Sequence, residues 1–129
     1  MAPTLLPYDD RRHRDAVIAL WRRVFAYPEP HNEPGLVIDR KLACDDLFFV
    51  AEDDGALVGT VMAGYDGHRG WLYYLAAAAS HRGRGVGRSL VAEAERLLEA
   101  MGCPKVQLMV RPENTGARGF YDAIGYEPF

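Results

Sequence analysis

The stretch LAAAASHRGRGVGRSLVAEAERLLEA, residues 75–100, decides the fold because it joins the end of a strand, a glycine-rich loop and a helix without a break. Apolar residues recur from Leu90 onward at the spacing of one helix face, so a helix is predicted over residues 86–101. The first turn of a helix leaves backbone N–H groups unpaired and carries a partial positive charge. The sequence therefore predicts a phosphate site at the front of this helix.

The loop before the helix is positively charged and has few side chains close to its backbone. Glycine lets phosphate oxygens approach the main chain, and arginine can hold them with two hydrogen bonds. Six residues carry this prediction: Arg82, Gly83, Arg84, Gly85, Gly87 and Arg88. The dinucleotide fingerprint GxGxxG is excluded, because after Gly83 and Gly85 it requires glycine at position 88, where this sequence has arginine. A P-loop is excluded because the loop does not end in G-K-[ST]. Taken alone, the stretch also fits a glycine-rich turn with solvated arginines.

The remaining sequence predicts a mixed α+β fold. Strands are predicted at residues 4–8, 47–53, 56–65, 70–78 and 105–110, and further helices at residues 9–25, up to about 44, and 114–125. Asp-Gly turns connect the three middle strands into an antiparallel meander. Strand 70–78, helix 86–101 and strand 105–110 then form a βαβ unit with a right-handed crossover. Three prolines make residues 27–35 a loop.

Composition narrows the class of protein. The chain has 129 residues, a formal net charge of −3 and two widely separated cysteines, Cys44 and Cys103. This favours one soluble domain with reduced thiols in the cytoplasm, without a bound metal. The acidic balance argues against a general nucleic-acid partner, and no apolar run reaches the length of a membrane span.

Two motifs in register resemble those of the GNAT N-acetyltransferase family. Arg82-x-x-Gly85-x-Gly87 matches the R/Q-x-x-G-x-G/A signature of that family. The second motif, N-x-x-A-x-x-F-Y-x-x-x-G-Y, is present as Asn114, Ala117, Phe120, Tyr121, Gly125 and Tyr126. The resemblance covers residues 47–126, is closest to small stand-alone bacterial members, and makes residues 1–129 a single acetyltransferase domain.

The resemblance implies a sheet that splays into a V between strands 70–78 and 105–110, with helices on both faces and acetyl-CoA in the gap. Main-chain N–H groups from Arg84 to Arg88 are expected to hold its pyrophosphate. A strand bulge near Ala76 and Ala77 is expected to turn the N–H of Ala77 toward the thioester carbonyl. The implied cofactor-binding residues are Leu75, Ala76, Ala77, Arg82, Gly83, Arg84, Gly85, Val86, Gly87, Arg88, Asn114, Ala117, Phe120 and Tyr121.

The implied reaction is direct attack of a primary amine on the acetyl thioester, with Tyr121 as general acid to the departing thiolate. The alternative interpretation of Tyr121 is a core aromatic residue without a catalytic role. Asn114 is expected to bind the pantetheine arm, to cap the helix at residues 114–125, or to do both. A non-catalytic acyl-CoA-binding regulatory domain of the same fold is the alternative function.

The general base and the acceptor amine stay open. The loop at residues 27–35 is expected to border the acceptor site. Candidate bases are Glu29, His31, Glu33, Asp66, His68, Tyr73, Tyr74 and Glu113. The family has a last strand beyond the position of Phe129, whereas this sequence stops at GYEPF. An open strand edge favours association, so a homodimer or another arrangement that covers this edge is expected.

Overall fold

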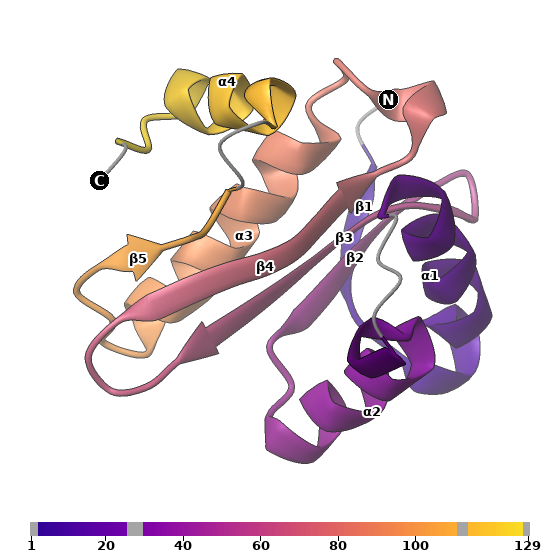
Figure 1. Ribbon diagram of the computed structural model, residues 1–129, viewed down its shortest axis with the longest axis horizontal. Coiled ribbons are helices and arrows are strands. Elements are labelled where there is room, and N and C mark those ends of the chain that lie inside the picture. The colour runs from indigo at the N-terminus through magenta and orange to yellow at the C-terminus, as the bar shows by residue number, and fades with distance from the viewer. Residues whose placement is uncertain (1–2, 26–29, 111–113, 128–129) are drawn as a thin grey trace.

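A five-stranded mixed sheet organises the computed structural model, which describes residues 3–25, 30–110 and 114–127. The strands are β1 (Thr4–Pro7), β2 (Phe48–Asp53), β3 (Ala56–Tyr65), β4 (Gly70–Ala77) and β5 (Val106–Gln107). The helices are α1 (Asp10–Val24), α2 (Pro34–Cys44), α3 (Val86–Ala100) and α4 (Thr115–Ala123), with short 3-10 turns at Pro30–Asn32 and Ala79–His81. The sheet order is β1-β2-β3-β4-β5, antiparallel except for the parallel pair β4–β5 (Figure 1). The predicted α+β fold is confirmed.

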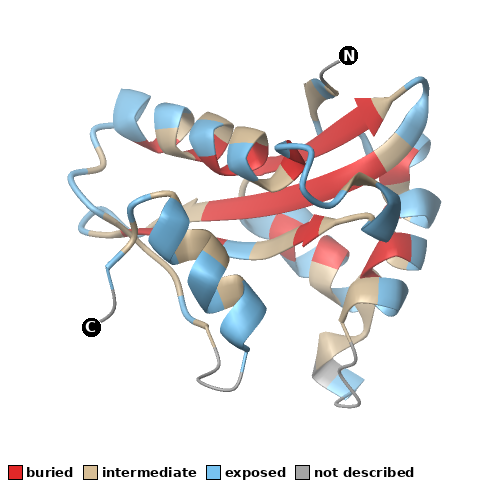
Figure 2. Cartoon of the chain, turned by 90° about the horizontal axis from the view of Figure 1, so that it is seen from above, coloured by how far each residue is buried: buried red, intermediate tan, exposed pale blue. Residues whose placement is uncertain are grey.

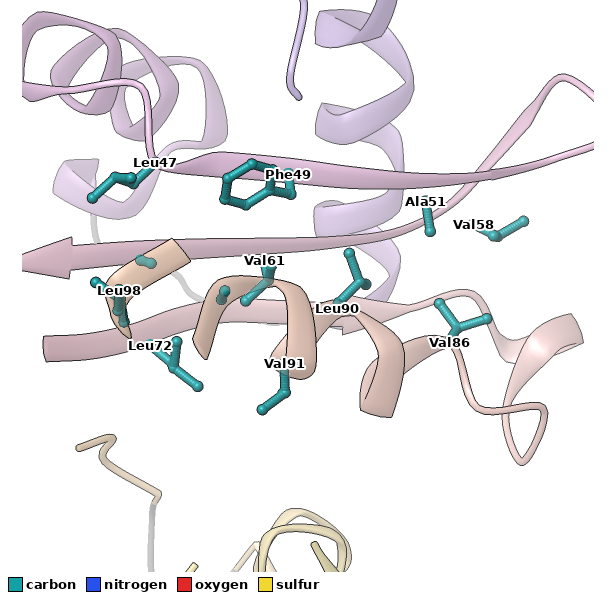
Figure 3. Packing of buried hydrophobic residues seen from close by; sticks show 12 residues of the cluster. Leu47, Phe49, Ala51, Val58, Val61, Leu72, Val86, Leu90, Val91 and Leu98 are labelled. Carbon is teal, nitrogen blue, oxygen red and sulfur yellow. The ribbon is translucent and has the colours of Figure 1, made fainter. Parts of the chain in front are cut away.

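Helices cover both faces of the sheet, as expected, and each face has its own apolar core. On one face, Leu90, Val91 and Leu98 of α3 pack against Phe49 and Val61 of the sheet (Figure 3). On the other face, α1 and α2 contribute a second cluster, formed by Val17, Leu20, Trp21, Ile38, Phe48, Val50, Met62 and Ala76. The central strands are therefore buried between two helical layers (Figure 2).

Local signals set where the helices begin. The carboxylate of Asp9 accepts hydrogen bonds from the N–H groups of Arg11 and Arg12 and so caps α1. The predicted loop at residues 27–35 is too long at its C-terminal end. A 3-10 turn starts at Pro30 and α2 already begins at Pro34, because proline suits the first turn of a helix. Within the described residues, no helix is long and apolar enough to cross a lipid bilayer.

The sheet opens between β4 and β5. The two strands pair only as Gly70 with Val106 and Trp71 with Gln107. Strand β5 is therefore much shorter than the predicted strand at residues 105–110. Beyond Trp71, β4 pairs with β3 and no longer with β5, which agrees with the expected V. At the paired end, Gly70 lets the segment that leads into β5 approach closely, because a Cβ on Gly70 would lie 2.7 Å from the Cys103 sulfur.

The bulge in β4 lies earlier than expected. Thr60 pairs with Ala76, whereas Met62 pairs with Tyr73, so β4 has one extra residue around Tyr74 and Leu75. Tyr74 also has a positive φ of 54°. The expectation of a bulge near Ala76 and Ala77 is wrong by about two residues, because Ala76 has already returned to regular pairing with β3.

Candidate functional site

The glycine-rich loop forms an open turn in front of α3. Gly83 and Gly85 have φ values of 78° and 83°, in the left-handed region that favours glycine. A Cβ built at either position would meet no atom of the described residues within 4 Å, so this part of the structure leaves the space above the loop open. Arg82, Arg84 and Arg88 are exposed on the same loop and helix start. A ligand can therefore approach this backbone from solvent.

The first amides of α3 precede its hydrogen-bond ladder. The N–H of Ser89 donates to the carbonyl of Gly85 at 3.0 Å, which is the first bond of the helix. Gly85 occupies the N-cap position, and no side chain in the described part of the chain caps the helix there. The N–H groups of Gly85, Val86, Gly87 and Arg88 are thus placed to bind an anion.

One member of the predicted amide set has a different role. The N–H of Arg84 donates to the carbonyl of His81 at 3.2 Å and closes the turn. The Arg84 N–H is therefore engaged within the turn, and phosphate binding by the amides of Gly85 to Arg88 stays a prediction.

A contact that the sequence did not reveal, between His81 and Asp53, joins the start of the glycine-rich loop to the end of β2. The His81 Nε2 atom lies 2.7 Å from Asp53 Oδ2 at the end of β2, and His81 Nδ1 lies 2.8 Å from the Ser80 hydroxyl. The two partners Asp53 and His81 are 28 positions apart in the chain. An acidic residue at the end of a hairpin strand was the one available signal, and it is too common to identify the contact.

Helix α4 lies beside the front of α3 (Figure 1). The contact is made by Phe120, because a Cβ on Gly87 would lie 3.2 Å from its ring. The Asn114 side chain accepts a hydrogen bond from the N–H of Ala117 at 3.1 Å and so caps α4. The capping role of Asn114 is confirmed, and its contact with a ligand stays a prediction.

Tyr121 lies on the inner side of α4. Its ring meets those of Phe120 at 5.0 Å and Tyr126 at 5.8 Å, both edge to face. Burial raises the pKa of the Tyr121 hydroxyl to about 12. Tyr121 therefore stays protonated at neutral pH and can donate a hydrogen bond, whereas full proton transfer to a thiolate with a pKa near ~8.5 is strongly uphill.

The open edge of β4 presents Ala77. The N–H of Ala78 donates to the carbonyl of Val58 at 2.8 Å. Because successive residues of a strand point their N–H groups in opposite directions, the N–H of Ala77 points away from β3 and toward the opening of the V. Leu75 and Ala77 also pack toward the face that carries α3. The structure thus places Leu75, Ala77 and the start of α3 at Val86 on the same face of the sheet.

Two of the candidate bases, Asp66 and Glu33, have structural roles. The Asp66 carboxylate accepts hydrogen bonds from the N–H groups of His68 (2.9 Å) and Arg69 (2.7 Å), which lower its pKa. It stabilises the β3–β4 turn, at the end of β4 opposite the glycine loop. The Glu33 carboxylate caps α2 through the N–H of Leu36, and this bond lowers its pKa as well. Glu29, Glu113 and the side chain of His31 lie outside the described residues.

Tyr73 is the candidate base with a distinctive environment. Its half-exposed ring lies before the bulge, and its hydroxyl accepts a hydrogen bond from Lys41 at 3.0 Å. The Lys41 ammonium is buried, donates to the carbonyl of Ala63, and lies 2.7 Å from Asp45. This cluster puts a fixed hydroxyl and a compensated positive charge on the face of β4 that carries α1 and α2.

Comparisons with known proteins agree with this geometry. The model of the acetyltransferase (GNAT) family matches residues 14–126. An acetyltransferase of Pectobacterium atrosepticum is 49% identical over 114 residues, covering 88% of this chain and 80% of that protein. An acetyltransferase of Sodalis glossinidius is 47% identical over 119 residues, covering 90% of this chain and 83% of that protein. The chain belongs to the GNAT acetyltransferase family.

Solved structures show the same fold at lower identity. The aminoglycoside N-acetyltransferase AAC(6')-Iy in complex with CoA has a TM-score of 0.78 at 21% identity, over 99% of this chain and 91% of that one. The ribosomal-protein-S18-alanine N-acetyltransferase of Escherichia coli has a TM-score of 0.83 at 19% identity, over 98% and 79% of the two chains.

Proposed function

We propose that this protein transfers an acetyl group from acetyl-CoA to a primary amine by direct attack. The observation that carries the proposal is the front of α3, where four amides precede the first helical hydrogen bond and three arginines are exposed, beside a split sheet. A diphosphate fits this donor set because it is anionic and can accept several backbone hydrogen bonds at once. The CoA-bound aminoglycoside N-acetyltransferase with the same fold supports the choice of donor.

One group of residues would bind the diphosphate, and another would contact the thioester. The amides of Gly85 to Arg88 would hold the diphosphate. Acetyl-CoA supplies an activated acetyl thioester when it is bound. The N–H of Ala77 would donate to the carbonyl oxygen, where a preorganised donor stabilises developing negative charge. Tyr121 would donate a hydrogen bond to the sulfur.

The amine must approach from the open edge of β4. We place its entrance near Tyr73, because this hydroxyl is held by Lys41 and remains partly exposed. A hydroxyl held in this way can accept a hydrogen bond from a neutral amine and orient it. A lysine-like amine, with a pKa near ~10.4, would have to lose a proton first, at a cost of about 4.6 kcal/mol at pH 7.

A two-stage experiment tests the proposal. Thermal denaturation is measured with and without acetyl-CoA and CoA, and both should raise Tm. A panel of small, peptide and protein amines is then assayed by release of the CoA thiol. Thiol release that depends on one class of amine supports the function, whereas a raised Tm without turnover on any amine would indicate a binding module. Unchanged Tm with both compounds would contradict the proposal.

A further inference from the structure

Thr60 is fully buried on β3, directly opposite the bulge of β4. Its hydroxyl accepts a hydrogen bond from the indole N–H of Trp21 at 2.9 Å. The same hydroxyl donates to the carbonyl of Tyr74 at 2.9 Å. One side chain therefore joins helix α1 to the backbone of the bulge.

The Thr60 hydroxyl provides a hydrogen bond to a backbone carbonyl of the bulge. A bulge breaks the regular ladder, so backbone groups of the extra residues lose their partners on the next strand. The carbonyl of Tyr74 belongs to these extra residues, and carbonyl groups inside a fold need hydrogen-bond partners. The Thr60 hydroxyl supplies such a partner to Tyr74, and the Trp21 N–H, which donates to the same oxygen, fixes which way this hydroxyl donates.

The conformation of Tyr74 needs the same support. A tyrosine at a φ of 54° is rare and persists only where neighbours hold it in place. The ring of Tyr74 packs against Trp21 at 4.5 Å and meets Phe25 edge to face at 5.4 Å. Trp21 thus contacts the bulge twice, through its ring and through Thr60.

The bulge decides which amide of β4 faces the opening. Gly70 donates its N–H away from β3, to the carbonyl of Lys105. In an unbroken strand the alternation would give this direction to every second residue, and hence to Ala76. The extra residue shifts the alternation by one, so that Ala77 faces the opening while Ala76 pairs with Thr60.

We infer that Thr60 is a positioning residue for acetyl transfer, and that with Trp21 it holds the bulge in the register that presents the Ala77 N–H. This inference rests on the proposed function, because the Ala77 N–H is there the donor to the thioester carbonyl. The Thr60 side chain is buried between the sheet and α1, so its role would be to position the bulge and not to contact a reacting group.

The test compares three purified variants with the wild type. Thr60→Val keeps the shape but removes the hydroxyl, and Thr60→Ser keeps the hydroxyl. Val17→Ala lowers stability from the same core and keeps both hydrogen bonds of the Thr60 hydroxyl. For Thr60→Val we expect kcat to fall about 10- to 100-fold, the loss that a small misplacement of a reacting group causes. The KM for acetyl-CoA should stay within about threefold, because the front of α3 is unchanged, and Thr60→Ser should recover most of kcat.

Two results would overturn the inference. One is a Thr60→Val enzyme with kcat within about twofold of the wild type. The other is an equal loss of kcat in Val17→Ala at matched Tm, which would make the effect one of stability. If the wild type acetylates no amine, the proposed function fails, and amide hydrogen exchange of the free protein decides the inference alone. Exchange at Ala76 and Ala78 should then quicken at least tenfold in Thr60→Val relative to Val17→Ala, and equal rates would refute it.

Discussion

Replacing Gly85 with alanine tests whether the shape of the loop, rather than its charge, creates the phosphate site. The residue has a φ of 83°, and an added Cβ meets none of the atoms that the structure describes within 4 Å, so the substitution acts through backbone preference. Gly67, in the β3–β4 turn, is a matched control with a φ of 92° and the same free space. Each alanine costs about 1–2 kcal/mol of unfolding free energy, which lowers Tm by about 3–10 °C in a domain of this size.

The two variants should differ in binding. If the loop relaxes from the left-handed region, at least one amide loses the diphosphate, and a hydrogen bond to a charged group is worth ~1.5–3 kcal/mol. The Gly85→Ala protein should therefore bind CoA about 10- to 100-fold more weakly by calorimetry, while Gly67→Ala binds it like the wild type. Equal affinities in the two variants would refute the reasoning, whether both are strong or both are weak.

Four further predictions follow from the same geometry. Tyr121→Phe should lower kcat while CoA affinity stays within about twofold, and unchanged turnover would leave this residue a core aromatic. Because burial raises the pKa of Tyr121 to about 12 and the unfolded value is near ~10, urea titrations should show unfolding free energy falling as pH rises from ~10 to ~12, and this fall should shrink in Tyr121→Phe. Tyr73→Phe should raise the KM for the amine and spare that for acetyl-CoA in steady-state assays; an unchanged amine KM would remove it from the entrance. Gly59→Ala should push α3 outward, since its Cβ would lie 2.7 Å from Val86 and 2.8 Å from Leu90, and should lower Tm and CoA affinity together, and a wild-type Tm would contradict this.

The sequence predicted the elements whose signals are local. Helix α3 was found to within one residue at its C-terminal end because its apolar face repeats over four turns, and Asn114 marked the start of α4. The Asp-Gly turns between β2, β3 and β4 were equally plain. These features depend on residues that are neighbours in the chain.

Features that depend on distant residues were missed. The run LYYLAAA gives no alternation from which a bulge at Tyr74 could be located, and the bulge is fixed by Thr60 and Trp21, which come from other elements. The length of β5 was overestimated because an apolar run shows strand propensity and not whether a partner strand lies beside it. The Asp53–His81 contact likewise joins two segments that only the folded sheet brings together.

The central claim is that main-chain amides at the front of α3 hold a diphosphate. The most direct measurement is a titration of ¹⁵N-labelled protein with CoA, and separately with pantetheine, which lacks the diphosphate, followed by NMR. CoA should shift the amide signals of Gly85, Val86, Gly87 and Arg88 strongly downfield, whereas pantetheine should leave them near their free positions. Saturation with CoA while these four signals stay in place would contradict the account.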